Sequence, residues 1–228
     1  MASTKKKPVD PKCANCPSRP CSQGLPKGTV LPPFCPMTHH KRLIRETMPQ
    51  VLDPGIRDFY LVSALTEKEG YDPRAAREEG RILPVRPRIR EIAAFADALG
   101  AKKIGMAFCS GLHDEARRAA AILEGHGLDV VSVICSCGAV DKTEVGVPEE
   151  YKIRNPGQFE ASCNPLVQAE ILNHSGTAFN VLVGLCVGHD MLFTSRSKAP
   201  VTTLIVKDRL SGHNPMVSLY TRYHRFMV

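Results

Sequence analysis

Hydrophobic positions follow two different patterns along the 228-residue chain, and the change comes near residue 103. After that point, short apolar and β-branched runs alternate with segments of helical periodicity, which is typical of a parallel sheet with flanking helices. The pattern predicts strands over 104–108, 128–134, 180–185 and 201–206, and helices over 112–124 and 164–175. We therefore predict an α/β fold with a small parallel sheet of about four strands.

Three further segments after residue 103 have weaker secondary-structure patterns. Residues 139–162 form a long excursion without strong periodicity, and loops of that length are uncommon in compact domains and often functional. Residues 191–195 predict a helical turn, and Asn214-Pro215 predicts the start of one more short helix.

Before residue 103 the periodicity is helical or absent. Predicted helices cover 38–47, 55–69, 73–80 and 87–99. Residues 10–37 are rich in proline, glycine and cysteine and lack hydrophobic periodicity. This segment cannot form a hydrophobic core of its own, so another interaction, such as a bound metal, must stabilise it. The predicted organisation is a cysteine-rich metal-binding segment at 1–37, a helical region at 38–102 and an α/β domain at 103–228.

The composition of the chain argues against a membrane protein and against a nucleic-acid-binding protein. No apolar run is long enough to cross a bilayer, and no apolar stretch follows the lysines at positions 5–7, so we predict a cytoplasmic protein without a membrane partner. The net charge is +7, but the basic residues are spread along the chain, aromatic residues make up 6% and tryptophan is absent. We therefore expect no nucleic-acid partner.

Nine cysteines are the strongest compositional signal. In a reducing compartment, such a number favours metal binding or catalysis over a disulfide framework. No cysteine lies between Cys35 and Cys109, so two separate sites are expected.

The N-terminal group has the spacing C-x2-C-x4-C-x13-C, formed by Cys13, Cys16, Cys21 and Cys35. A C-x2-C turn places two thiolates on one soft metal ion, which predicts a metal site. Zinc ribbons usually pair two such turns, whereas iron–sulfur ligation tolerates an irregular spacing and often has proline after a ligand, as at Cys16 and Cys35. The spacing therefore slightly favours an iron–sulfur cluster over zinc.

The second group contains cysteines at the ends of predicted strands. Cys109, Cys135 and Cys186 each follow a strand, Cys137 lies two residues beyond Cys135, and Cys163 precedes a predicted helix start. Carboxyl ends of parallel strands share one edge, so these thiols are expected to converge and to hold an iron–sulfur cluster or zinc. The alternative is that Cys109 and Cys186 are small buried hydrophobic residues.

Catalytic candidates follow the third strand. Cys186, His189 and Asp190 would serve a metal centre, with the last two in acid–base or supporting roles. Gly184 and Gly188 also frame Cys186 like a nucleophile elbow. The leading hypothesis is a redox or sulfur-transfer metalloenzyme acting on a small or sulfur-containing substrate with a redox partner. The alternatives are a cysteine-nucleophile hydrolase or transferase with a structural N-terminal zinc, and a non-catalytic metal or cluster carrier.

Several motifs together resemble one family. The chain is similar over nearly its whole length to an uncharacterised prokaryotic family, domain of unknown function 1847. The resemblance implies a prokaryotic cytoplasmic protein with metal, described as zinc, at the four N-terminal cysteines, and it implies no reaction. It rests on those cysteines and on Asn164-Pro165-x-x-Gln168-Ala169, residues 184–190, residues 199–203, Lys207-Asp208-Arg209 and His213-Asn214-Pro215.

Overall fold

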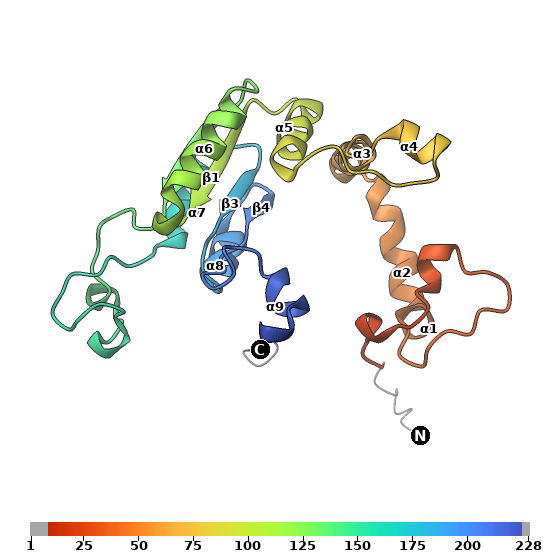
Figure 1. Cartoon of the computed structure of the whole chain (residues 1–228), viewed down its shortest axis with the longest axis horizontal. Helices are drawn as coiled ribbons and strands as arrows, with labels where there is room; N and C mark the ends of the chain where they lie inside the picture. Colours follow the sequence, from red (N-terminus) through yellow and green to blue (C-terminus); the bar gives the residue numbers. More distant parts are fainter. Residues whose placement is uncertain (1–8, 225–228) are drawn as a thin grey trace. The chain divides into compact units, whose positions relative to one another are not determined.

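The computed structural model describes residues 9–224, and the chain divides into two compact units, residues 1–63 and 64–228 (Figure 1). The boundary between the units lies inside a helix. The division predicted from sequence, 1–37, 38–102 and 103–228, stays a prediction because compactness alone does not define independently folding domains. The first eight residues of its first segment lie outside the described part.

The first unit consists of short helices and buries very little. Two 3-10 turns, Cys13–Asn15 and Pro20–Gln23, precede α1 (Pro36–His39), α2 (Lys41–Thr47), a 3-10 turn at Met48–Leu52 and the start of α3 (Pro54–Glu69). Among the described residues of this unit, only Pro20 and Cys35 are buried. Most large apolar side chains on α2 and α3 are exposed, and Phe59 and Val62 are only half-buried, so hydrophobic burial contributes little to the stability of this unit.

The second unit is built on a four-stranded sheet in which every neighbouring pair of strands is parallel. The strands are β1 (Lys103–Phe108), β2 (Asp129–Ile134), β3 (Asn180–Val183) and β4 (Val201–Ile205), in the order β2-β1-β3-β4. The central strands β1 and β3 are buried along almost their whole length, as expected when helices cover both faces of a parallel sheet. The predicted α/β fold with a small parallel sheet is confirmed.

Helices connect consecutive strands. α6 (His113–Glu124) joins β1 to β2, α7 (Pro165–Ser175) joins β2 to β3, and α8 (His189–Arg196) joins β3 to β4. The Asn164 side chain caps α7 by accepting a hydrogen bond from the Val167 N–H. α8 is longer than the helical turn predicted at 191–195. The other helices of the unit are α4 (Pro73–Glu78), α5 (Arg88–Leu99) and α9 (Met216–Tyr220).

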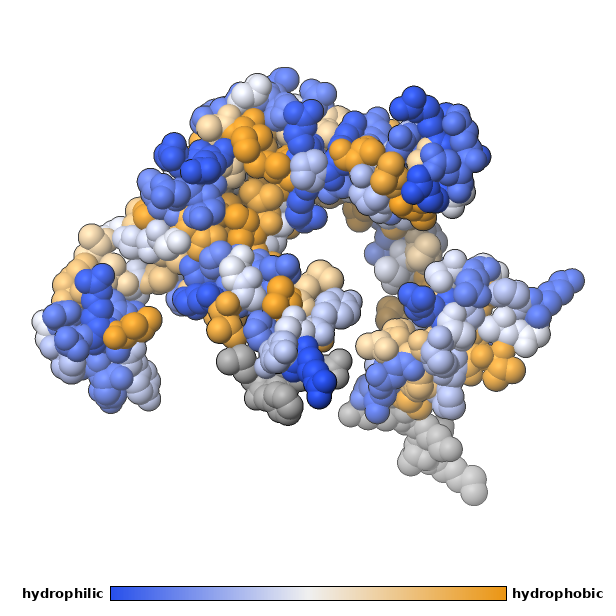
Figure 2. All heavy atoms as spheres, in the orientation of Figure 1, coloured by the Kyte–Doolittle hydropathy of each residue, from blue (hydrophilic) through white to orange (hydrophobic). Residues whose placement is uncertain are grey.

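The core lies between the sheet and the helices on its two faces. Parallel crossovers are right-handed, so the change of direction after β2 puts α6 on one face and α7 and α8, which contact each other, on the opposite face. Fully buried side chains of these helices include Leu123, Leu172 and Phe193, and Ile92 and Ala96 bring α5 into the same core. Figure 2 shows hydrophobic residues gathered over this sheet-bearing region. Across residues 9–224, no helix combines the length and apolar character needed to span a membrane.

The strand order places the turning point of the sheet between β1 and β3, whose onward connections run in opposite directions. In open parallel sheets, groups beyond the carboxyl ends of the strands at this point line the ligand crevice. Cys109 directly follows β1 and Cys186 lies shortly after β3, so the fold places two cysteines at the position where a ligand is expected.

We predict that Gly105→Ala destabilises the second unit by about 1–3 kcal/mol, the range for overpacking a core. A Cβ at this position of β1 would lie 1.9 Å from Asn180 Oδ1, and Asn180 is buried and held by hydrogen bonds to Thr177 and Ser197. Urea unfolding followed by circular dichroism measures the change. Gly55→Ala is the control because its Cβ would meet open space, and equal midpoints for the two variants would contradict this steric argument.

Candidate functional site

Three cysteines from distant parts of the sequence lie together at the carboxyl edge of the sheet. Cys109 follows β1, Cys135 follows β2, and Cys163 precedes the Asn164 cap of α7. The Sγ atoms of Cys135 and Cys163 are 3.7 Å apart, and the side chain of Cys109 interacts with that of Cys135. The Asn164 N–H donates to the Cys135 carbonyl oxygen over 2.7 Å, which fixes the start of α7 beside the end of β2. We call these three cysteines, together with Cys186, which follows β3 and interacts electrostatically with Cys163, the strand-end sulfur site.

A buried glutamine connects the two strands that lead into Cys109 and Cys135. Gln168 of α7 is fully buried, and its Nε2 donates to the carbonyl oxygens of Phe108 over 3.2 Å and Val133 over 2.7 Å. Phe108 is the last residue of β1, immediately before Cys109, and Val133 is the penultimate residue of β2, two residues before Cys135. Gln168 therefore holds together the two strand ends that carry Cys109 and Cys135.

Nitrogen donors contact three of the four sulfurs. Lys207 Nζ lies 3.2 Å from Cys109 Sγ, an Arg209 guanidinium nitrogen lies 3.1 Å from Cys186 Sγ, and the Ser110 N–H donates to Cys135 Sγ over 3.3 Å. Cations and N–H donors stabilise a thiolate relative to a thiol. Lys207 and Arg209 follow β4, so all four strands contribute to the site. Sequence reasoning gave these two residues no role, although their position after the fourth strand was a usable signal.

The pKa values of Cys109 and Cys163 are shifted in opposite directions. The neighbouring Cys135 and burial raise the pKa of Cys109 to about 12, although the Gly111 N–H and Lys207 act in the opposite direction. The hydrogen bond with Cys135 lowers the pKa of Cys163 below its ordinary value, against the effects of burial and of charge on Cys186 and Cys109. Cys163 therefore becomes a thiolate more readily than Cys109.

The residues expected to act with Cys186 have local structural roles. Gly188 has φ 89° and precedes α8, so the strand–turn–helix arrangement of an elbow is present around Cys186. The Asp190 carboxylate accepts hydrogen bonds from the N–H groups of Gly188 and Met191, which stabilises the start of the helix. The partner that the structure gives to the Cys186 sulfur is Arg209, and His189, the first residue of α8, is half-buried.

Cys137 lies in the turn that follows β2. Its N–H donates to the Ile134 carbonyl oxygen over 3.2 Å, and its side chain is half-buried. Within residues 9–224, the sulfur–sulfur hydrogen bond recorded for this turn involves Cys135. Of the two cysteines predicted here, Cys135 is thus the one beside Cys163.

The four N-terminal cysteines differ in exposure. Cys13 and Cys21 are exposed, Cys16 is half-buried and Cys35 is buried. In the described part of the chain, no three or more cysteine, histidine, aspartate or glutamate side chains are grouped as ligands of one metal ion, and this holds for both cysteine groups. The predicted metal ligands Cys13, Cys16, Cys21 and Cys35 stay a prediction.

The long excursion at residues 139–162 folds into a small lobe held by charged side chains. An antiparallel bridge between Asp141 and Ala161 closes its base. The Lys152 side chain is only 3% exposed, and its ammonium lies 2.8 Å from Asp141 Oδ1 and 3.0 Å from Glu149 Oε1. Asp141 also accepts hydrogen bonds from the N–H groups of Thr143 and Glu160. The charged contacts give this lobe a defined structure without a hydrophobic core.

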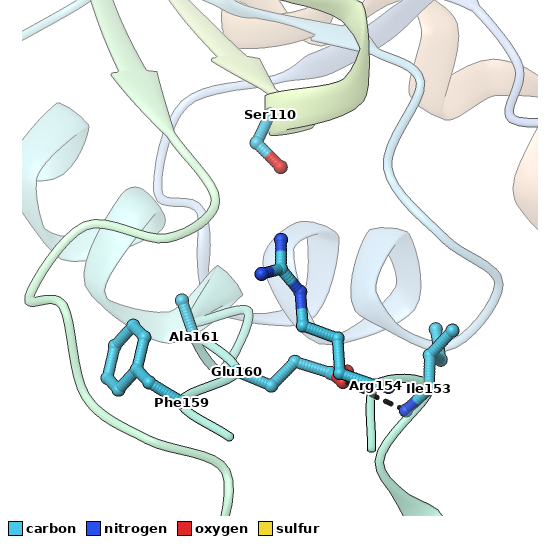
Figure 3. A pocket seen from close by; sticks show the side chains of 6 residues that line it. All are labelled: Ser110, Ile153, Arg154, Phe159, Glu160 and Ala161. Atoms are coloured by element: carbon cyan, nitrogen blue, oxygen red, sulfur yellow. Dashed lines mark hydrogen bonds between the residues drawn. The ribbon is translucent and has the colours of Figure 1, made fainter.

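A pocket of about 360 Å³ lies between this lobe and the strand-end sulfur site (Figure 3). Ser110, whose N–H donates to Cys135 Sγ, is one of its lining residues, and Ala161 lies two residues before Cys163. The Arg154 side chain extends from the lobe towards Ser110, as Figure 3 shows. The complete lining is Ser110, Ile153, Arg154, Phe159, Glu160 and Ala161. Sequence reasoning identified the excursion as a functional candidate but not these side chains.

Comparisons with known proteins leave the activity open. The sequence model of one family, described as a protein of unknown function (DUF1847), matches residues 35–204. The chain is 49% identical over 137 residues to an uncharacterised protein of Methanocaldococcus jannaschii, which corresponds to 60% of this chain and 68% of the relative. No solved structure matches the chain.

We predict that the 139–162 lobe loses its structure in acid. Hydrogen bonds from Lys152 and from the Thr143 and Glu160 N–H groups hold the pKa of Asp141 well below its ordinary value of 3.8. This depressed carboxyl pKa stabilises the folded lobe above pH 3.8, and the stabilisation disappears as the pH falls through the folded-state pKa. Hydrogen exchange of the lobe amides, corrected for intrinsic rates, should show protection at pH 5–7 and progressive loss below about pH 4.

The matched variants are Asp141→Asn and Glu150→Gln. The first removes the charge that Lys152 contacts and should abolish protection of the lobe amides at pH 5–7. The second removes an exposed carboxylate of the same lobe and should leave protection unchanged. Equal protection in both variants would show that Asp141 does not hold the lobe.

Proposed function

Because the chain belongs to the DUF1847 family, whose description assigns no activity, we propose a function from the chemistry of the strand-end sulfur site. This site binds a soft metal, with an iron–sulfur cluster favoured over zinc, and performs redox or sulfur-transfer chemistry. A small sulfur-containing molecule is the proposed substrate, and a redox partner supplies or accepts electrons. None of the nine cysteines forms a disulfide, which supports a reducing compartment such as the cytoplasm.

The observation that carries the proposal is the set of donors around the sulfurs. Lys207, Arg209 and the Ser110 N–H each contact a different sulfur of the site. Metals bind cysteine as thiolate, so groups that stabilise negative sulfur favour metal binding. Hydrogen bonds to sulfur and nearby charge are also the features by which proteins set the potential of iron–sulfur clusters.

One pair of sulfurs has the spacing expected of two ligands of a shared metal. Cys135 and Cys163 Sγ atoms are 3.7 Å apart, whereas two thiolates on one tetrahedral zinc ion, each bonded at about 2.3 Å, would be about 3.8 Å apart. Cys109, Cys135, Cys163 and Cys186 are thus the proposed ligands in either case. With three of the four bound, an iron–sulfur cluster would supply electron transfer and one open iron for substrate.

In this proposal the protein residues have separate tasks. Gln168 and Asn164 fix the strand ends and the start of α7, so the cysteines are held before any ligand binds. Lys207 and Arg209 offset the negative charge of the bound thiolates. The N-terminal cysteines form a second, structural metal site that stabilises a unit with almost no buried side chains.

A metal-free thiol enzyme is the second candidate. The lowered pKa of Cys163 and the elbow-like turn around Cys186 favour a cysteine nucleophile of a hydrolase or transferase. Arg209 lies 3.1 Å from the Cys186 sulfur, and in this candidate the N-terminal cysteines would keep a structural zinc. Metal analysis separates this candidate from the leading proposal.

We predict that Cys135→Ser and Cys163→Ser each remove the metal of the strand-end sulfur site. The measurement is iron, zinc and acid-labile sulfide content, with a visible spectrum, on protein purified without oxygen. Wild type should contain iron and sulfide in near-equal amounts, and either variant should lose the share that belongs to this site. Cys137→Ser is the matched control and should retain full content, because Cys135 is the residue that contacts Cys163.

Two outcomes of this measurement would contradict the leading proposal. Wild type that contains only N-terminal metal would favour the thiol enzyme, as would unchanged content in both Cys135→Ser and Cys163→Ser. Loss of metal in Cys137→Ser but not in Cys135→Ser would show that Cys137, and not Cys135, is the metal ligand.

We predict that the N-terminal unit depends on its own metal. Removal of metal with a chelator, or Cys35→Ser, should increase proteolytic cleavage within residues 9–63 at least tenfold, because that unit buries little else. Limited proteolysis with mass spectrometry locates the cuts. Ser22→Ala, in the same segment, is the control and should behave as wild type. Equal cleavage with and without metal would contradict a structural role for these cysteines.

A further inference from the structure

The pocket beside the strand-end sulfur site contains one unpaired charge. Glu160 lines the pocket, but its Oε1 is paired with the Lys142 ammonium, and its Oε2 accepts the N–H groups of Ile153 and Arg154 over 2.9 Å and 2.8 Å. By contrast, no carboxylate in residues 9–224 forms an ion pair with the Arg154 guanidinium. Arg154 therefore gives the pocket a net positive character.

The contacts of Glu160 determine where Arg154 is placed. By accepting the two successive N–H groups of residues 153 and 154, the carboxylate fixes the backbone from which the arginine side chain extends. The lobe that carries both residues is closed by the Asp141–Ala161 bridge and held by Lys152. Glu160 is thus a positioning residue, and Figure 3 shows the guanidinium directed across the pocket towards Ser110.

The rest of the lining indicates the kind of anion. Phe159, Ile153 and Ala161 present apolar surface beside the guanidinium. A planar guanidinium matches a planar carboxylate through two parallel hydrogen bonds. A phosphate dianion would call for more than one cation, and Arg154 is the one unpaired cation of the described lining. The combination favours a small organic acid with an apolar body over an inorganic anion.

We propose that this pocket binds the carboxylate of a small organic acid and presents the acid to the strand-end sulfur site. The assignment rests on the proposed function in naming the acid as substrate. Arg154 holds the carboxylate on the side of the pocket where Ser110 lies, and Phe159 and Ile153 contact the body of the acid. Because the Ser110 N–H also donates to Cys135 Sγ, one residue connects the bound acid to the sulfurs.

Benzoate is a suitable probe because it combines a carboxylate with a planar apolar ring. Benzoate, benzamide and inorganic phosphate are titrated separately into the full-length protein, and binding is followed by isothermal titration calorimetry. We expect benzoate to bind at millimolar concentrations, and benzamide and phosphate to bind at least about tenfold more weakly. Arg154→Gln should weaken benzoate binding about tenfold or more. Arg154→Lys should give an intermediate affinity, because lysine keeps the positive charge but lacks the two parallel N–H donors of the guanidinium.

Arg118→Gln is the matched control, because it removes an exposed arginine on α6 outside the pocket and should bind benzoate like wild type. Equal affinity for benzoate and benzamide would overturn the proposal, as would tighter binding of phosphate, unchanged binding by Arg154→Gln, or no binding of benzoate.

Repeating the titration on Cys135→Ser separates the two proposals. This variant lacks the proposed metal but keeps Arg154, so benzoate should still bind within about threefold of wild type. Loss of metal without loss of benzoate binding supports an independent carboxylate pocket. Absence of metal from wild type would overturn the proposed function while leaving the pocket intact, whereas failure of benzoate to bind would overturn the pocket alone.

Discussion

The parallel alignment of four strands is the constraint on which the candidate site depends, because it brings all four carboxyl ends to one edge. β1, β2 and β3 each lead into a cysteine, and β4 leads into Lys207 and Arg209. Partly buried thiolates are costly unless cations or N–H donors compensate them. Here the sulfurs and the compensating cations come from different strands, so the chemistry of the site follows from the topology. An antiparallel β4 would place the two cations at the opposite edge of the sheet.

The same edge anchors the long excursion between β2 and α7. Its last residues lead into Cys163, and the Asn164 N–H that follows is bonded to the Cys135 carbonyl. Inside the excursion, Lys152 replaces a hydrophobic core with a nearly buried cation that contacts two carboxylates. Such a contact is specific in direction, and it can hold a short segment in one conformation where apolar side chains are too few. The pocket wall that carries Arg154 is therefore built from charged groups and attached directly to the sulfurs.

The two units obtain stability in different ways. The second unit buries a continuous core between its sheet and helices, whereas the described residues of the first unit bury only Pro20 and Cys35. Below a certain buried area, small folds depend on metals, disulfides or association for stability. The four N-terminal cysteines lie in a segment without a hydrophobic core, where a bound metal would provide the missing stability. For this reason the N-terminal site is proposed to be structural, whereas the strand-end sulfur site is proposed to be reactive.

Local signals in the sequence by themselves determined the fold class and most helices and strands, although the helix predicted over 38–47 is divided into α1 and α2 and β3 ends at Val183. Asn164-Pro165 capped α7, Gly176 ended it, and apolar β-branched runs became parallel strands, because caps and periodicity act over a few residues. The placement of Cys109 and Cys135 at strand ends was predictable for the same reason. Only the tertiary structure decided that Cys135 rather than Cys137 lies beside Cys163, that Lys207 and Arg209 reach sulfur, and that Arg154 faces Ser110. These contacts join residues far apart in the chain, and they depend on strand order, register and the path of an aperiodic loop, none of which a local pattern encodes.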